Sequence, residues 1–306
     1  MKILITGGAG FIGSRLALRL AHDNEIVIVD NLTTGTIENI PDHCTFIEGD
    51  VGEESTYEKL KPYQFEAIYH IAGQSSGEIS YDDPVYDLNT NTKSTLLLLD
   101  FASSCGCGNF IYMSSMSVYG DNHDSPAKEN DEKNPKSFYG VGKLASEHYL
   151  RINEDTQMKK TVLRLCNTYG PGQNMNNLRQ GMVSIFIKQA VDEESILVKG
   201  SADRFRDFIH IDDVLNVLEK LLFDASEGFE IFNLTGGIKR TVGDLVRVIV
   251  DTAPGKIITN YEGSTPGDQH GICGDNSKIK SKLAWSPKIN FEEGISSMVK
   301  WYSEKK

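Results

Sequence analysis

Residues 1–30 read MKILITGGAGFIGSRLALRLAHDNEIVIVD, two apolar runs on either side of a glycine-rich turn. The runs Lys2–Thr6 and Glu25–Asp30 are short and apolar, and each predicts a buried strand. The turn, Gly7-Gly-Ala-Gly-Phe-Ile-Gly13, follows the first run directly and opens a helical pattern. Glycines at this place permit a tight turn, let backbone N–H groups approach a pyrophosphate, and let the helix pack closely on the strand. The stretch therefore predicts the first strand–helix–strand unit of a dinucleotide-binding sheet.

Asp30 ends the second predicted strand, about 20 residues after the glycine turn. A carboxylate there accepts hydrogen bonds from both ribose hydroxyls and repels a 2′-phosphate, so we expect NAD rather than NADP. The alternative interpretation of Asp30 is a turn or helix cap. Asp50-Val51, after the third predicted strand, is a candidate contact for the adenine edge, although that pair by itself does not distinguish a contact from an ordinary turn.

Strands and helices alternate through the first half of the chain. Further strands are predicted at Thr45–Glu48, Ala67–Ile71, Asn109–Ser114 and Thr161–Leu165, and helices at Ser14–His22, Glu54–Lys61, Thr95–Ser103 and Ser137–Asn153. Near-continuous apolar strands between amphipathic helices indicate a parallel sheet covered on both faces. The predicted fold class is α/β: a Rossmann-type, doubly wound parallel sheet with a smaller, interleaved C-terminal α/β substrate domain.

The alternation breaks after Asn167. From there the sequence predicts a helix at Gly181–Val191, a charged loop up to Arg206, a strand–helix pair at Phe208–Phe223, a strand at Phe232–Leu234, a helix after Thr241, an extended Lys256–Tyr261 and a last helix at Phe291–Tyr302. We expect residues 1–165 with about 205–235 to form the NAD-binding domain. Residues 166–204 with 236–306 would then form the substrate-binding region.

Composition excludes several classes of protein. The formal net charge of −12 disfavours a general nucleic-acid or anionic-membrane binder. The cysteines form no CxxC pair and are expected to be buried small hydrophobes, so we expect no metal site; they are Cys44, Cys105, Cys107, Cys166 and Cys273. Met1 lies next to an apolar strand, and no apolar run approaches the roughly 20 residues that span a bilayer. We therefore expect a cytoplasmic protein.

Tyr139 and Lys143 form a candidate catalytic pair. They are four residues apart in Phe138-Tyr-Gly-Val-Gly-Lys143, which places both on one face of a helix. A free tyrosine, with a pKa of about 10, is a poor base at neutral pH. A neighbouring ammonium and a positive nicotinamide ring both favour the phenolate and are expected to lower the pKa of Tyr139. Ser115 follows a predicted strand end, where its hydroxyl could hold a substrate oxygen.

These motifs make the chain resemble the extended short-chain dehydrogenase/reductase family. Within that family it is similar to the NAD-dependent epimerase/dehydratase branch and is UDP-glucose 4-epimerase-like. The resemblance runs nearly end to end and also includes His70-Ile-Ala-Gly73, Asn91-Thr-Lys-Ser-Thr95, Leu163-Arg-Leu-Cys-Asn167, Tyr169-Gly-Pro-Gly172, Arg206-Asp-Phe-Ile-His-Ile-Asp-Asp213, Phe232-Asn-Leu-Thr235 and Pro266-Gly-Asp268. It implies retained NAD, a nucleotide-diphosphate sugar as substrate, and a homodimer whose interface is a helix pair.

The motifs and the resemblance together give a set of expected site residues. The catalytic residues are Ser115, Tyr139 and Lys143. Cofactor contacts are expected from Gly7, Gly10, Phe11, Ile12, Gly13, Asp30, Asn31, Thr33, Gly35, Asp50, Val51, Ile71, Ala72, Gly73, Asn91, Tyr139, Lys143 and Cys166. Substrate contacts are expected from Ser75, Ser115, Asn167, Arg179, Lys199, Arg206 and Asp268, of which Asn167 and Arg206 match family positions that contact the diphosphate.

Two positions separate the members of the family. Sugar-nucleotide 4,6-dehydratases carry an acidic pair where this chain has Met116 and Ser117, and neither residue is a proton donor of suitable strength. The GDP-fucose synthase pattern has a cysteine at the place of Ser117, so a 3,5-epimerising reductase is also disfavoured. The pattern that remains is nucleotide-sugar 4-epimerisation through a transient 4-keto intermediate.

Three departures from the family pattern leave alternatives open. The arginine that commonly clamps the diphosphate is Thr265, the glycine of the NVxGT motif is Ser94, and a lysine after the HxAG-like turn is replaced by Ser75-Ser76. Arg179, Lys199 or His270 would have to replace the missing charge. The first alternative is a one-way C4 reductase or oxidase of a nucleotide sugar, for example a 4-keto heptose. The second is a regulatory NAD-binding protein without turnover, although such proteins usually lose the tyrosine or the lysine.

Overall fold

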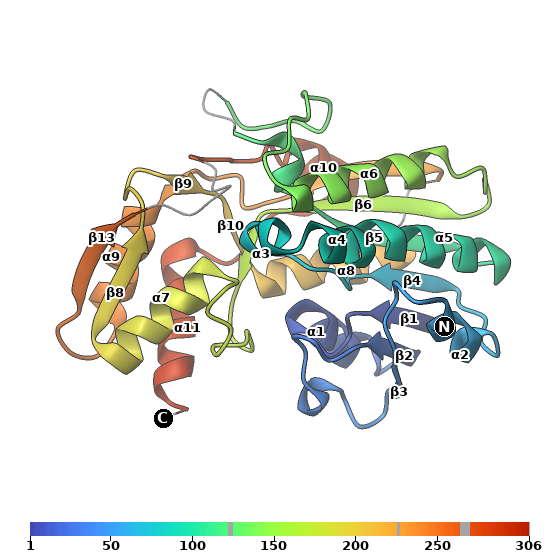
Figure 1. Ribbon diagram of the computed structural model, residues 1–306, viewed down its shortest axis with the longest axis horizontal. Helices are drawn as coiled ribbons and strands as arrows, with labels where there is room; N and C mark the ends of the chain where they lie inside the picture. Colours follow the sequence, from blue (N-terminus) through green and yellow to red (C-terminus); the bar gives the residue numbers. More distant parts are fainter. Residues whose placement is uncertain (122–124, 225–226, 264–269, 306) are drawn as a thin grey trace.

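Seven parallel strands form the main sheet in the computed structural model, which describes residues 1–121, 125–224, 227–263 and 270–305 (Figure 1). Their order is β11-β6-β5-β4-β1-β2-β3. The strands are β1 (Lys2–Thr6), β2 (Glu25–Asp30), β3 (Thr45–Glu48), β4 (Ala67–His70), β5 (Asn109–Ser115), β6 (Lys159–Leu165) and β11 (Phe229–Leu234). The first three have the predicted bounds, and the predicted Rossmann-type sheet is confirmed.

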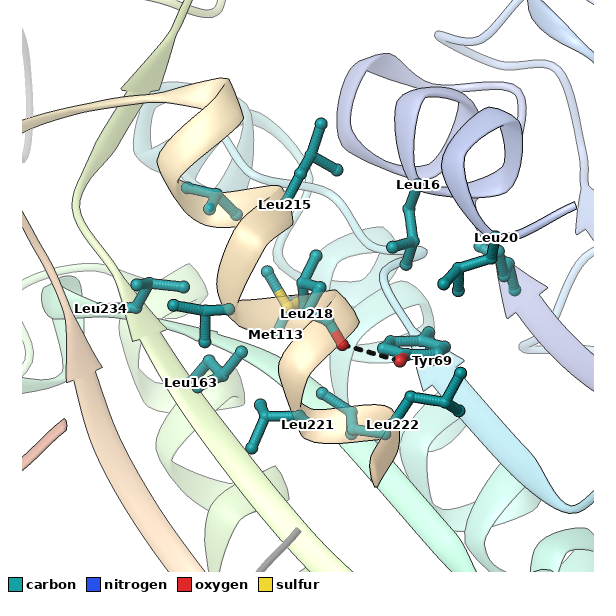
Figure 2. Packing of buried hydrophobic residues seen from close by; sticks show 14 of the residues in the cluster. Leu16, Leu20, Tyr69, Met113, Leu163, Leu215, Leu218, Leu221, Leu222 and Leu234 are labelled. Atoms are coloured by element: carbon teal, nitrogen blue, oxygen red, sulfur yellow. Dashed lines mark hydrogen bonds between the residues drawn. The ribbon is translucent and has the colours of Figure 1, made fainter. Parts of the chain in front are cut away.

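Helices cover both faces of this sheet because side chains of a strand alternate between its faces. Ile3 and Ile5 of β1 pack with α1 (Phe11–Leu20) and α8 (Ile211–Asp224), whereas Leu4 packs on the opposite side. That opposite side is covered by α2 (Glu54–Leu60), α5 (Ser94–Ser104) and α6 (Phe138–Ile152). Figure 2 shows the α8 side, where the Tyr69 hydroxyl donates a hydrogen bond of 2.8 Å to the carbonyl of Leu218.

A second hydrophobic cluster lies beside the sheet, toward the C-terminus (Figure 1). It is formed mainly by α7 (Met182–Glu193), β8 (Ser195–Lys199), α9 (Val242–Thr252) and α11 (Phe291–Ser303), and β8 pairs in parallel with β13 (Ile258–Glu262). The predicted charged loop up to Arg206 is therefore wrong over Ser195–Lys199. Ile196 and Val198 alternate inward into this cluster, and that burial makes the segment a strand.

The remaining elements are short. They are η1 (Ile37–Asn39), α3 (Gly77–Asp82), α4 (Pro84–Leu88), the π-helix η2 (Asn89–Lys93), η3 (Met116–Tyr119), β7 (Asn167–Tyr169), β9 (Phe205–Arg206), β10 (Phe208–His210), β12 (Arg240–Thr241) and α10 (Ser277–Leu283). β7 pairs with β10 and β9 with β12, outside the main sheet. Over the described residues, no helix is long and apolar enough to cross a membrane.

A buried ion pair joins α6 to β6. Arg164 and Glu147 are 1% and 3% exposed, and Arg164 Nη2 lies 2.6 Å from Glu147 Oε2. The hydroxyl of Ser114 donates a 2.6 Å hydrogen bond to Glu147, and Arg164 donates a 2.6 Å hydrogen bond to the hydroxyl of Tyr119. Because both charges are fully removed from water, each depends on the other for compensation.

We predict that Arg164→Met lowers the free energy of unfolding by about 3–5 kcal/mol, because Glu147 would remain buried without its cation. Urea unfolding followed by circular dichroism measures this change. Arg151→Met, an exposed arginine on the same helix as Glu147, is the matched control and should cost less than about 0.5 kcal/mol. Equal stability of the two variants would contradict the role given to the pair.

Candidate active site

A cleft of about 930 Å³ runs along the carboxyl ends of β1, β2, β4, β5 and β6. Chain order explains its place: from β1 the chain builds β2 and β3 on one side, then returns to build β4, β5 and β6 on the other. Loops therefore leave β1 and β4 in opposite directions and open a crevice between them. The far end of the cleft is lined by residues of α7 and β8, so the second hydrophobic cluster forms its other wall.

The glycine turn after β1 forms the floor of the cleft. Gly7 has φ +71°, and a Cβ on it would lie 2.7 Å from the backbone nitrogen of Ala72. Gly10 caps α1 without a side-chain hydrogen bond, so no side chain covers the first-turn N–H groups of this helix. Phe11 and Ile12 of that turn line the cleft. The N-terminus of α1 has no side-chain cap and lies beside the glycine turn. Its free N–H groups suit the pyrophosphate of a dinucleotide.

Asp30 is held at the end of β2 by backbone donors. Its carboxylate accepts hydrogen bonds from the N–H of Ala9 (3.0 Å) and of Leu32 (2.8 Å). Asn31 donates a 2.8 Å hydrogen bond to Asp50, which brings these acidic and amide groups together on the cleft wall. Asp30 therefore caps a turn, as the alternative interpretation has it, and also lines the cleft. Its negative charge there disfavours a 2′-phosphate.

Tyr139 and Lys143 lie together on α6, with Ser137 as the N-cap of that helix. Both are buried at the cleft wall. Lys143 Nζ donates a 3.0 Å hydrogen bond to the carbonyl of Met113 and lies 5.9 Å from the centre of the Tyr139 ring. Ser115, at the end of β5, lines the same wall and accepts a 3.1 Å hydrogen bond from the N–H of Ser117. The three predicted catalytic residues are thus brought together.

The pKa values of the pair are shifted in directions set by burial. Burial raises the pKa of Tyr139 to about 12; a hydrogen bond with Ser115 lowers it and the charge of Asp87 raises it. Burial lowers the pKa of Lys143 to about 8, against the charges of Asp87 and Glu147. The expected lowering of the Tyr139 pKa by Lys143 is therefore wrong for the protein itself. The Lys143 ammonium donates its hydrogen bond to the carbonyl of Met113, and burial of Tyr139 dominates the shift of its pKa.

Most predicted cofactor residues line the cleft, but Gly13, Gly35 and Asn91 do not. A Cβ on Gly13 would collide with the carbonyl of Gly7, and one on Gly35 would lie 2.7 Å from the carbonyl carbon of Ala9. These two glycines therefore let backbone segments pack behind the turn. Asn91 is 1% exposed and donates hydrogen bonds to the carbonyl of Gln74 and to Asp87 behind the wall.

The predicted substrate residues Ser75, Ser115, Asn167, Arg179, Lys199 and Arg206 all line the cleft. Arg206 is buried and donates hydrogen bonds to the carbonyls of Phe205 (2.7 Å) and His270 (3.3 Å). Arg179 forms a salt bridge with Asp82, and Gln180 donates a hydrogen bond to Ser75, so the segment before α7 meets the region around α3. Asp268 and Thr265 lie outside the described residues.

Two residues at this wall had no role in the sequence analysis: Gln74, in the cleft lining, and Asp87, behind it. Gln74 lines the cleft and donates a 2.7 Å hydrogen bond to Asp87, which is 1% exposed. The only signal in the sequence was that Asp87 stands four residues before Asn91, on the same helix face. Met116 and Ser117 also line the cleft, beside Ser115, so no carboxylate stands at those two positions.

Comparison with known proteins agrees with this geometry. Residues 3–235 match the model of the NAD dependent epimerase/dehydratase family. A putative UDP-glucose 4-epimerase of Methanocaldococcus jannaschii is 32% identical over 302 residues, 98% of this chain and 97% of that protein. The UDP-glucose 4-epimerase of Mycolicibacterium smegmatis is 29% identical over 313 residues, 100% of this chain and 99% of that protein.

Solved structures show the same fold. The UDP-glucose 4-epimerase of Thermotoga maritima with UDP-glucose superimposes with a TM-score of 0.93 at 31% identity, covering 100% of this chain and 99% of that one. The UDP-glucose 4-epimerase of Thermus thermophilus in complex with NAD gives a TM-score of 0.92 at 29% identity, covering 99% of both.

The glycine cradle, the acid that ends β2 and the Tyr139–Lys143 pair occupy one cleft of a Rossmann-type sheet, and the family match spans the strands that carry them. NAD is the cofactor that this cleft accommodates, and the predicted enzyme class is confirmed. The chain is an NAD-dependent enzyme that belongs to the epimerase/dehydratase family of extended short-chain dehydrogenases/reductases.

Proposed function

We propose that this enzyme is a nucleotide-sugar 4-epimerase that works through a transient 4-keto intermediate. The observation that carries the proposal is the position of Tyr139, which is buried, and of Ser115, which is partly buried. Both line one continuous cleft between the dinucleotide turn and the α7–β8 wall. In such a cleft, NAD and the nucleotide sugar would bind at opposite ends, and their reacting groups would meet at Tyr139. Two similar proteins, from Methanocaldococcus jannaschii and Thermotoga maritima, carry the name of UDP-glucose 4-epimerase.

The same proposal divides the chain into two regions. Residues 1–165 with about 205–235 hold NAD, and residues 166–204 with 236–306 hold the nucleotide sugar. Two cations line the cleft and suit a diphosphate: Lys199 belongs to the second region, and Arg206 stands at the start of the 205–235 segment, next to it. Arg179 is held by Asp82, so it contributes there only if that salt bridge opens.

Tyr139 is the acid–base residue of the proposed reaction. Its phenolic oxygen takes the proton of the sugar C4 hydroxyl and later returns a proton to the C4 oxygen of the product. Bound NAD supplies the acceptor and then the donor of the hydride at C4, together with a positive ring charge. The ammonium of Lys143 adds to the positive potential that favours the Tyr139 phenolate. Ser115 holds the same sugar oxygen by a hydrogen bond.

Inversion requires that the flat 4-keto sugar turns within the cleft before hydride returns. Three small side chains, Ser75, Ser76 and Ser115, line the cleft into which Tyr139 also projects. Met116 and Ser117 give no acid that could expel a C6 hydroxyl, which separates the proposed reaction from dehydration. The wall thus leaves room for rotation and lacks the competing chemistry.

One-way oxidation or reduction at C4 is the second candidate. The same small side chains also admit a larger 4-keto sugar, such as a heptose, that is only reduced. A regulatory protein without turnover is disfavoured because both Tyr139 and Lys143 are present and buried at the cleft wall.

We also propose a homodimer. Apolar side chains are exposed on the neighbouring helices α4, α5 and α6; they are Val85, Leu88, Leu96, Val141 and Ile152, with 68% of Val85 and 53% of Val141 exposed. An apolar face shared by packed helices suits a second copy of itself around a two-fold axis.

We predict that the enzyme inverts C4 of a UDP-hexose without added NAD and without net change in NADH, because an epimerase returns its hydride within one cycle. The measurement is NMR of C4 after incubation with a panel of nucleotide hexoses, together with NADH absorbance. Stoichiometric formation or consumption of NADH on a 4-hydroxy or 4-keto sugar would decide for the one-way reaction.

Tyr139→Phe should lower turnover by a factor of roughly 10² or more while NAD binding stays nearly unchanged, because only the acid–base group is lost. Lys143→Ala should impair both. Steady-state kinetics and NAD titration measure the two effects. Tyr149→Phe, on the same helix but outside the cleft lining, serves as control and should behave as wild type. A Tyr139→Phe enzyme with most of the wild-type rate would remove Tyr139 from the mechanism.

Val141→Lys should convert the dimer to a monomer, because it places a charge in the centre of the proposed apolar interface. Analytical ultracentrifugation gives the oligomeric state. Leu18→Lys is the matched control: Leu18 is 59% exposed on α1, away from α4–α6, and its substitution should leave the dimer intact. A monomeric wild type would refute the dimer.

A further inference from the structure

Asp87 is a buried carboxylate just behind the cleft, and the proposed reaction does not use it. It lies on α4, is 1% exposed, and accepts hydrogen bonds at one oxygen from Gln74 Nε2 (2.7 Å) and Asn91 Nδ2 (3.0 Å). Both donors are neutral amides. A carboxylate without a directly bonded cation is costly to bury, so its place calls for a further favourable interaction.

Two glycines, Gly73 and Gly142, indicate how close Lys143 lies to Asn91 and to the Asp87 carboxylate. A Cβ on Gly73 would lie 2.6 Å from Asn91 Oδ1 and 3.2 Å from Lys143 Nζ, so these two atoms converge behind the same peptide. A Cβ on Gly142, the residue before Lys143, would lie 3.5 Å from Asp87 Oδ2. Asn91 thus bonds Asp87 through its Nδ2, while its Oδ1, which accepts no hydrogen bond from any described residue, lies against the same peptide as the Lys143 ammonium.

The remaining titratable groups around Lys143 are already occupied or neutral. Glu147, one turn along α6, is paired with Arg164. On β5, the ring of Tyr112 lies 4.9 Å from Lys143 Nζ, and burial keeps the pKa of Tyr112 above its usual range. On β4, burial and the charge of Lys143 lower the pKa of His70 to about 3, so it is neutral. Tyr139 completes the surroundings.

We propose that Asp87 is the counterion of Lys143, a positioning residue that acts across Asn91 to keep the ammonium charged and in place at the cleft wall. Its negative charge opposes the burial that favours neutral lysine. Gln74 fixes the carboxylate from the cleft side, so the same amide links the substrate cavity to the counterion. The inference concerns the Tyr139–Lys143 pair of the proposed function, but it holds for either direction of C4 redox chemistry.

The electrostatic effect is consistent with this geometry. The charge of Asp87 raises the pKa of Lys143 against burial, and the charge of Lys143 lowers the pKa of Asp87 against burial. Asp87 also raises the pKa of Tyr139. Removing this one negative charge should therefore move both apparent pKa values of the coupled pair to lower pH.

The test is Asp87→Asn, which removes the charge with little change in volume. In NMR of the carbon-13-labelled Lys143 side chain, assigned with Lys143→Met and recorded without substrate or NAD, wild type should titrate at about pH 8, as its pKa indicates. Asp87→Asn should titrate at least about one pH unit lower. Asp100→Asn, an exposed carboxylate on α5, is the matched control and should match wild type. An unchanged titration in Asp87→Asn would overturn the proposal.

The pH–rate profile gives a second readout. Both limbs should move to lower pH in Asp87→Asn and return toward wild type in Asp87→Glu, which restores the charge. Circular dichroism of each variant over the same pH range shows where it stays folded, and the limbs are compared only within that range, because stability itself depends on pH. Lower rates in Asp87→Asn with unmoved limbs would show a structural role only and would also overturn the proposal. If the enzyme proves to be a reductase, the Lys143 titration still decides the matter.

Discussion

The reversal of strand order at β1 is the constraint on which the rest of the structure depends. Because β2 and β4 both pair in parallel with β1, the connections after β1 and β4 diverge at one edge of the sheet. The N–H of Ala72 donates a 3.0 Å hydrogen bond to the carbonyl of Thr6, which holds the two connections together at the base of the cleft. Only a glycine at position 7 leaves space for this approach. The cofactor end of the cleft is thus a direct consequence of sheet topology.

Helix α6 links the sheet to the candidate catalytic residues. Its N-terminal half presents Tyr139 and Lys143 to the cleft, and one turn further Glu147 is bonded to Arg164 of β6. The same Arg164 reaches Tyr119 of η3, the segment that follows Ser115. A single buried network therefore positions the helix that carries Tyr139 and Lys143 relative to the strand end that carries Ser115.

The cleft of this acidic protein is lined by several cations. The protein is acidic overall, with a formal net charge of −12, yet the cleft collects cations at its walls: Lys143, Arg179, Lys199, Arg204 and Arg206 line it. Lys143, Arg204 and Arg206 donate to backbone carbonyls, and Arg179 pairs with Asp82. Cations gathered at the cleft let an acidic chain accept ligands that carry phosphates. In the proposed reaction, the charges around Lys143 affect the proton transfer of Tyr139, because buried charges are little screened by water.

Local patterns in the sequence determined the strands of the main sheet, the glycine turn and the spacing of Tyr139 and Lys143, because each depends on neighbours within a few residues. The strand Ser195–Lys199 could not be predicted in this way, since its partner β13 is about 60 residues away in the chain and only the shared cluster makes it a strand. The helix Ser277–Leu283 was missed as well, because it buries only Ile279 and Leu283 and has no long periodic pattern. Tertiary structure alone decided that Asp87 stands behind Lys143 and that Tyr139 has a raised pKa. Burial and the approach of α4 to α6 are properties of the packed chain, and electrostatic interactions follow distance in space rather than distance in sequence.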